Sequence, residues 1–366
     1  MHKTSAWPLA LVYMALIVYA SLYPFADWRD QGIAAWTFLW APLPRYWTGF
    51  DVGANVVGYA PLGFLLALGA LRSGRERGAV FWPVLASSLL SLLLEATQSY
   101  LPSRVPSNVD WWLNSGGALV GAVLAAALER LGALDRWSRL RDRWFVPDSR
   151  GALVLLALWP AALLFPAAVP LGLGQVLERV EFGLADLLEG TPFLDWLPVR
   201  EVEMQPLVPS AELICVTLGA LIPCLLGYCV GRSPGRRAWF GVVALGLGIA
   251  ATALSTALSY GPAHAWVWLR PPVRVGLALA LVLALAAAPL PRRASAALLL
   301  LALAVHLSLL NQAPASAYFA QTLQTWEQGR FIRFHGLAQW LGWLWPFAAL
   351  GYVVMRVSRR DPVVRP

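Results

Sequence analysis

The sequence predicts an all-α fold, a polytopic bundle of about ten transmembrane helices. Of its 366 residues, 58% are hydrophobic and 13% are charged, and the mean hydropathy of +0.60 is too high for a soluble domain. Apolar runs of about 20 residues, the length that crosses a hydrocarbon core of roughly 30 Å, recur along the chain. The 19 Trp and 27 Pro fit this class, because Trp anchors at membrane interfaces and Pro is tolerated in spanning helices.

The apolar runs give the order of the expected helices. We expect the first run to be a retained helix and not a signal peptide, because its apolar core exceeds the usual 7–15 residues. The chain is therefore expected to be a multi-pass protein of the plasma (cytoplasmic) membrane of a bacterium. The ten predicted spans are 6–24, 51–71, 79–101, 111–131, 151–171, 210–231, 239–260, 273–290, 294–311 and 335–356.

The distribution of Lys and Arg predicts the orientation. With the N-terminus inside, most of the 28 basic residues fall in short cytoplasmic loops, as the positive-inside rule requires. Both termini are then cytoplasmic, and the polar stretch that begins at Asp51 lies at the outer face. The net charge of +8 reports this orientation, and we expect no nucleic-acid partner.

Four segments are expected along the chain. Residues 1–131 form a four-helix membrane domain, and 132–150 form a basic segment that lies on the cytoplasmic membrane surface. Residues 151–290 form a second four-helix unit, whose acidic outer loop, 172–209, holds an amphipathic interfacial helix at 175–190. Residues 291–366 supply two further helices and a basic tail.

An internal match suggests that the first two units are parallel repeats. The copies share an offset of 160 residues and begin on the same side of the membrane. In the second copy Glu95 is replaced by Ser255 and Asp110 by Arg270. Any activity is therefore expected in the first half. The matching residues are Arg72-Ser73 with Arg232-Ser233, Ser99-Tyr100 with Ser259-Tyr260, and Pro102 with Pro262.

Polar side chains of three predicted helices gather at one depth near the outer face. The three side chains, those of Glu95, Asn55 and Asn114, are each expected within a few helical turns of that face. Ionisable groups inside a membrane cost free energy to insert and therefore normally face the bundle interior. Glu95 and Asp110 are the candidate catalytic residues. The alternative is a structural lock of interhelical hydrogen bonds. The candidate ligand-binding residues are Asp51, Asn55, Gln98, Arg104 and Asn114, with Arg104 in a loop short enough to reach either carboxylate.

Metal chemistry has no support in the sequence. Cys215, Cys224 and Cys229 all fall in one apolar segment without metal-ligand spacing, and we interpret them as small buried side chains. The four His residues show no paired spacing. No metal and no cofactor are therefore expected.

The polar stretch resembles the VanZ-like family of membrane proteins, named for an accessory protein of glycopeptide resistance. The resemblance covers about residues 51–121 and implies a membrane domain of the cell envelope linked to teicoplanin susceptibility, without a settled molecular activity. The order that carries it is Asp51…Asn55…Pro61-x-Gly63, Ser91-x3-Glu95-x2-Gln98 and Arg104-x5-Asp110-x3-Asn114-x2-Gly117-x3-Gly121.

Three functions follow as hypotheses. The first is binding of, or action on, a lipid or amphiphilic envelope component in an outward-facing polar pocket. The second is an intramembrane enzyme with Glu95 as general acid or base on a lipid-linked substrate. The third is a transporter or flippase, which is disfavoured because the inner halves of the predicted helices carry no ionisable residues. Membrane lipids are the expected partners, and the sequence does not fix the oligomeric state.

Overall fold

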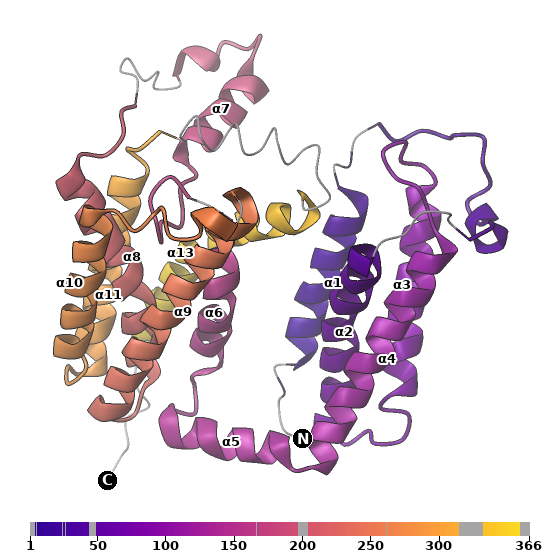
Figure 1. Cartoon of the computed structure of the whole chain (residues 1–366), viewed down its shortest axis with the longest axis horizontal. Helices are drawn as coiled ribbons and strands as arrows, with labels where there is room; N and C mark the ends of the chain where they lie inside the picture. Colours follow the sequence, from indigo (N-terminus) through magenta and orange to yellow (C-terminus); the bar gives the residue numbers. More distant parts are fainter. Residues whose placement is uncertain are drawn as a thin grey trace. The chain divides into compact units, whose positions relative to one another are not determined.

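The computed structural model describes residues 4, 6–23, 25, 27–43, 49–165, 167–196, 204–260, 262–314 and 332–358. Within these residues the chain is all-helical and contains no strand (Figure 1). Helices occur at all ten predicted spans. The α-helices are α1 (Ala6–Leu22), α2 (Gly49–Arg72), α3 (Phe81–Gln98), α4 (Asn108–Arg130), α5 (Ala133–Trp144), α6 (Arg150–Ala162), α7 (Leu177–Leu188), α8 (Pro209–Val230), α9 (Pro234–Tyr260), α10 (Pro271–Ala287), α11 (Arg292–Leu310) and α13 (Ile332–Ser358).

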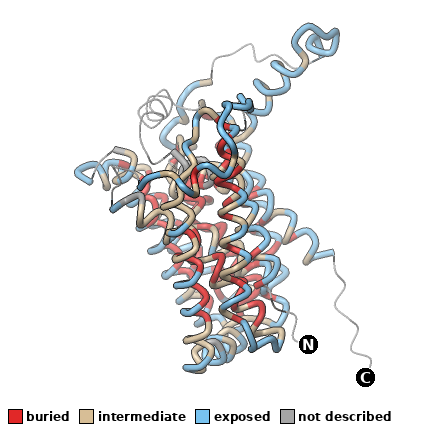
Figure 2. The backbone as a smooth tube through the Cα atoms, turned by 90° about the vertical axis from the view of Figure 1, so that its right-hand side faces the viewer, coloured by how far each residue is buried: buried red, intermediate tan, exposed pale blue. Residues whose placement is uncertain are grey.

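The lengths and compositions of these helices make the chain a multi-pass membrane protein. Within the described ranges, five helical stretches are long and apolar enough to cross a bilayer, and three further helices are apolar but shorter. Figure 2 shows buried residues along the inner sides of the helices and exposed ones along the outer sides, as expected of helices that face lipid. The chain divides into two compact units, Met1–Leu140 and Arg141–Pro366.

In the first unit, α2 and α4 make the most extensive helix–helix contact. Their backbones touch at glycines that have no room for a side chain. A Cβ on Gly117 would lie 2.3 Å from the carbonyl oxygen of Val56, and one on Gly121 would lie 1.8 Å from that of Ala60. The GxxxG step of the sequence therefore lies at a helix crossing. Helix α1 completes the unit by packing against α2 and α3, and α3 packs mainly against α4.

The second unit is built around α8, the most buried of its spans, which packs against α6, α9, α10 and α11. Cys215, Cys224 and Cys229 lie buried on α8 as free thiols, in agreement with their interpretation as apolar side chains. Helix α13 packs against α6 and α11. The two C-terminal helices thus share a core with the helices that precede them.

The predicted span at 151–171 is wrong in its second half, because α6 ends at Ala162. The residues that follow contain Pro170, Gly172 and Gly174, which disfavour continued helix. Non-helical backbone at membrane depth needs partners from neighbouring helices. Hydrogen bonds supply them from Ser255 Oγ to Leu164 O (2.7 Å), from Leu173 N to His306 Nε2 (3.4 Å), from Val176 N and Leu177 N to Asn311 Oδ1 (3.0 and 2.9 Å), and from Asn311 Nδ2 to Gly174 O (3.0 Å).

The two predicted interfacial segments are helical. Helix α5 follows Gly132, whose positive φ of 64° lets the chain leave the direction of α4. Helix α7 has no buried residue. Arg179 on α7 lies 4.6 Å from the ring centroid of Trp343 on α13, and this cation–π contact fastens α7 to the rest of the second unit.

The order of helix contacts in the first unit recurs in the second. Helix α8 contacts α9 and α10, which contact each other, as α2 contacts α3 and α4. A glycine lies at each crossing, Gly117 against Val56 and Gly276 against Val216, where a Cβ would lie 3.2 Å from the valine side chain. The two valines are 160 positions apart. The parallel repeat remains a prediction, and this shared packing supports it.

Candidate functional site

The candidate site is organised around the N-terminus of α4. Ser107 is the N-cap in extended conformation, and its Oγ accepts a hydrogen bond from the Asp110 backbone N–H at 3.4 Å. Glu95 reaches across from α3, and its Oε2 accepts the Ser107 N–H at 2.8 Å. Two carboxylates, Glu95 and Asp110, thus lie where the helix macrodipole favours negative charge.

Glu95 is closer to a helix end than the sequence suggested. The predicted span ran to residue 101, which placed Glu95 about six residues from the end, whereas α3 ends at Gln98. The Glu95 residue is nevertheless only 5% exposed. The burial comes from the neighbouring helices and from the Ser107 cap.

Asn55 and Asp110 join α2 to α4. The Asn55 Nδ2 group donates to Asp110 Oδ1 at 2.9 Å. This contact brings a predicted ligand-binding residue together with a predicted catalytic one. Asp51 lies on α2, one helical turn before Asn55, and its side chain is outside the described residues. Its predicted role in ligand binding stays a prediction.

Asn114 is the buried end of the cluster. Its Nδ2 group donates to Ser91 Oγ on α3 at 2.9 Å, and the residue is 5% exposed. Its Oδ1 atom is buried and has no hydrogen-bond partner among the described residues. An unmet buried acceptor costs about 1–3 kcal/mol. Among the described residues the Asn114 side chain thus has Ser91 as its hydrogen-bond partner through Nδ2 and none through Oδ1.

Gln98 and Arg104 contact the C-terminal end of α1. The Gln98 Nε2 group donates to the Ser21 carbonyl at 3.1 Å, and Arg104 Nη2 donates to the carbonyls of Ala20 at 3.3 Å and Tyr23 at 2.5 Å. A guanidinium at a helix C-terminus satisfies terminal carbonyls and complements the dipole. These contacts tie α3 and the loop after it to α1, a helix that the predicted lock of the second, third and fourth helices did not include.

The connection between α1 and α2 folds over the ends of α3 and α4. Gln31 Nε2 donates to the Ser99 carbonyl at 2.7 Å, and Asn108 Nδ2 donates to the Ala41 carbonyl at 2.8 Å. Trp28, Trp36 and Trp40 are exposed on this connection. The polar cluster therefore has an aromatic surface beside it, as is common at the headgroup depth of a membrane.

Sequence reasoning missed the serines that complete the α3–α4 contact. Ser88 Oγ accepts hydrogen bonds from Trp111 Nε1 at 3.0 Å and from Ser115 Oγ at 2.9 Å. Together with Ser91 and Glu95, Ser88 forms a polar stripe at three- and four-residue spacing on α3. That spacing was the available signal. Tyr59 of α2 lies near Ser91 and Glu95 and was missed because it carries no charge.

The second unit carries an ion pair where the first has the Asn55–Asp110 contact. Arg270, which the predicted repeat aligns with Asp110, contacts Glu212 through Nη2 and Oε1 at 2.5 Å. The pair joins the N-terminal ends of α8 and α10, as the amide–carboxylate contact joins those of α2 and α4. In each unit a polar contact thus joins two helix N-termini, through an amide–carboxylate hydrogen bond in the first and an ion pair in the second.

The helical spans define a multi-pass membrane protein, and its first unit carries a cluster of carboxylate and amide side chains. The family model described as VanZ/LLP1 matches residues 6–129, about a third of the chain, and identifies this segment as a VanZ-like domain. It includes α1 as well as the stretch at 51–121 that carries the resemblance. Neither a curated protein nor a solved structure matches the chain.

Proposed function

We propose that the VanZ-like unit binds a lipid or amphiphilic component of the cell envelope through the polar cluster at the N-terminus of α4. The observation that carries this proposal is the buried, unpartnered Oδ1 of Asn114. A helix lock alone gains nothing from an unmet acceptor at its centre, because such a group destabilises the fold unless a further donor reaches it.

The chemistry of the cluster indicates the kind of headgroup. Asn114 Oδ1 and the oxygens of Glu95 and Asp110 are hydrogen-bond acceptors, and an ionised carboxylate can accept several hydrogen bonds at once. The complement is a headgroup rich in donors, such as the hydroxyl groups of a sugar or glycerol, or an amine. The exposed tryptophans of the α1–α2 connection supply apolar surface for the rest of an amphiphile.

The distribution of Lys and Arg predicts that this cluster lies at the outer face of the plasma membrane. An envelope component of the outer leaflet would then meet it directly. The VanZ-like character of the unit supports a role in glycopeptide susceptibility, teicoplanin in particular, as the consequence of such binding.

A paired substitution separates binding from the helix lock. Asn114→Ala removes both the Ser91 hydrogen bond and the free acceptor, whereas Ser91→Ala removes the hydrogen bond and leaves Oδ1 in place. We expect an envelope lipid to co-purify in detergent with the unsubstituted protein and with Ser91→Ala. With Asn114→Ala its amount in mass spectrometry should fall about fivefold or more, the loss of one good hydrogen bond. Equal lipid content in all three proteins would contradict the proposal.

An intramembrane acid–base enzyme is the second candidate function, and the burial of Glu95 favours it. A buried carboxyl group whose position is fixed by a hydrogen bond from a helix cap is suited to proton transfer to or from a bound substrate. This candidate requires a chemically altered lipid in cells with the unsubstituted protein and none in cells with Glu95→Gln. Identical lipid profiles in the two strains would eliminate it.

A further inference from the structure

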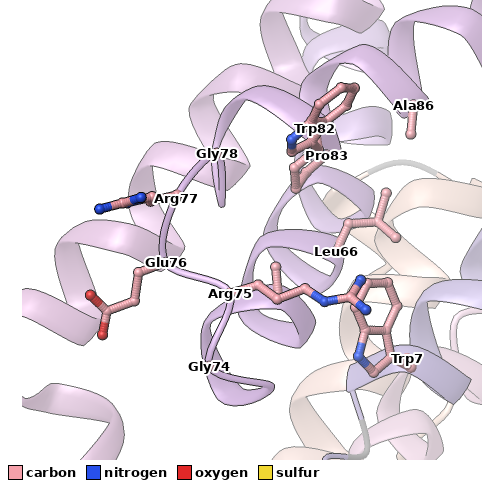
Figure 3. A pocket seen from close by; sticks show the side chains of 11 residues that line it. Trp7, Leu66, Gly74, Arg75, Glu76, Arg77, Gly78, Trp82, Pro83 and Ala86 are labelled. Atoms are coloured by element: carbon pink, nitrogen blue, oxygen red, sulfur yellow. The ribbon is translucent and has the colours of Figure 1, made fainter.

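A cavity lies at the end of α1, α2 and α3 that is remote from Glu95. Its volume is about 780 Å³, and its apolar wall comes from Trp7, Leu66, Ala70, Trp82, Pro83 and Ala86 (Figure 3). Ligand pockets commonly measure roughly 300–1,000 Å³. The turn between α2 and α3, Gly74–Gly78, closes one side of the cavity.

Two indoles line the cavity, and that of Trp7 is held by a hydrogen bond. Trp7 Nε1 donates to Ser73 Oγ at 3.1 Å, and a Cβ on Gly69 would lie 2.9 Å from the Trp7 ring. The Trp82 ring lies over Gly78, where a Cβ would be 2.7 Å from it and where φ is +76°. Side chains fixed in this way lose little conformational entropy when a ligand binds.

Arg75 brings positive charge to the cavity. Figure 3 shows its side chain extending toward Trp7, whereas Glu76 and Arg77 extend away. Its backbone is held by a hydrogen bond from Arg75 N to the Ala70 carbonyl at 3.0 Å. Nearby Arg72 is neutralised by Asp135 at 3.2 Å and Glu129 at 3.7 Å. Within the described residues Arg75 forms no ion pair, so its planar guanidinium is available for a phosphate.

We propose that this cavity binds an anionic glycerophospholipid, with Arg75 on the phosphate and the acyl chains against Leu66, Pro83 and Ala86. Charge favours this occupant, because described residues at this end of the unit include six arginines and three acidic residues. The Lys and Arg rule assigns this end to the cytoplasm, where anionic lipids attract basic segments. The proposal is independent of the outer cluster. The charged residues are Arg72, Arg75, Arg77, Arg130, Arg136 and Arg139, with Glu76, Glu129 and Asp135.

Lipid titration of the full chain in detergent, followed by native mass spectrometry, tests this site. Phosphatidylglycerol should bind more tightly than phosphatidylcholine. Arg75→Gln should weaken phosphatidylglycerol binding about tenfold, the effect of one charge-assisted contact, and Arg75→Lys should weaken it less. Arg77→Gln is the matched control, because Arg77 belongs to the same turn at the cavity and carries the same charge, but its side chain extends away in Figure 3, so its effect should stay below about twofold.

A second variant tests the apolar part of the site without changing charge. Ala86→Phe adds a ring to the cavity wall and should also reduce phosphatidylglycerol binding, and melting curves show whether each variant is folded. If Arg75→Gln is unfolded, Arg75→Lys and Ala86→Phe decide the matter. Equal effects of Arg75→Gln and Arg77→Gln, equal binding of the two lipids, unchanged binding by Ala86→Phe, or displacement of the lipid by excess inorganic phosphate would each overturn the proposal.

Discussion

The contact between α2 and α4 gives the sharpest prediction about stability. A Cβ on Gly121 would lie 1.8 Å from the Ala60 oxygen and 2.9 Å from the Phe64 nitrogen, and both are backbone atoms that no rotamer change can move away. To restore ordinary contact near 3.4 Å, Gly121→Ala must separate the two helices by about 1.5 Å. Overpacking of this kind costs roughly 1–3 kcal/mol or more, against a gain of about 1 kcal/mol in helix propensity.

Gly116→Ala is the matched control on the same helix. No atom lies within 4 Å of a Cβ at Gly116, so the substitution should leave the crossing intact and stabilise α4 slightly through its helix propensity. The assay is reversible unfolding in mixed detergent. Gly121→Ala should lower the free energy of unfolding by about 2 kcal/mol, and Gly116→Ala should raise it or leave it unchanged. Equal effects of the two substitutions would refute the glycine-based crossing.

Three further predictions concern the second unit. His306→Ala should lower the free energy of unfolding by about 2–4 kcal/mol, because His306 is buried and holds the non-helical segment after α6. The rate of hydrogen exchange in that segment should increase. Arg270→Ala should destabilise the protein more than Arg274→Ala, since it leaves the buried Glu212 without its partner; detergent melting measures the difference. Arg179→Ala should accelerate hydrogen exchange in α7 alone, by loss of a contact of about 0.5–1 kcal/mol; unchanged exchange would contradict the role of Trp343.

The fold was predictable from the sequence wherever hydrophobic length decides the structure. Helices occur at all ten expected spans, because apolar runs of this length can bury their backbone polar groups only as helices. The short α6 was not predicted. The segment after its truncated end donates backbone hydrogen bonds to His306 and Asn311, which lie more than 130 residues further along the chain.

The sequence indicated which residues belong to the candidate site, but it did not indicate which groups they would contact. Asn55 contacts Asp110, and Glu95 accepts the N–H of the α4 cap residue Ser107, whereas the sequence grouped Asn55 and Glu95 only by their depth in the membrane. The contacts of Gln98 and Arg104 with the end of α1 could not be read from the sequence. They depend on where α1 ends relative to α3, a packing relation that hydrophobic periodicity does not specify.

The central claim is that the outer cluster binds an envelope component and is not only a helix lock. Asp110→Asn tests it most directly, because the substituted amide keeps an oxygen that can accept the Asn55 hydrogen bond while the carboxylate charge is removed. In a strain that lacks the gene, the unsubstituted protein should lower teicoplanin susceptibility again and Asp110→Asn should not, with equal membrane insertion and detergent melting of the two proteins. Full restoration by Asp110→Asn, or loss of its fold, would contradict the claim.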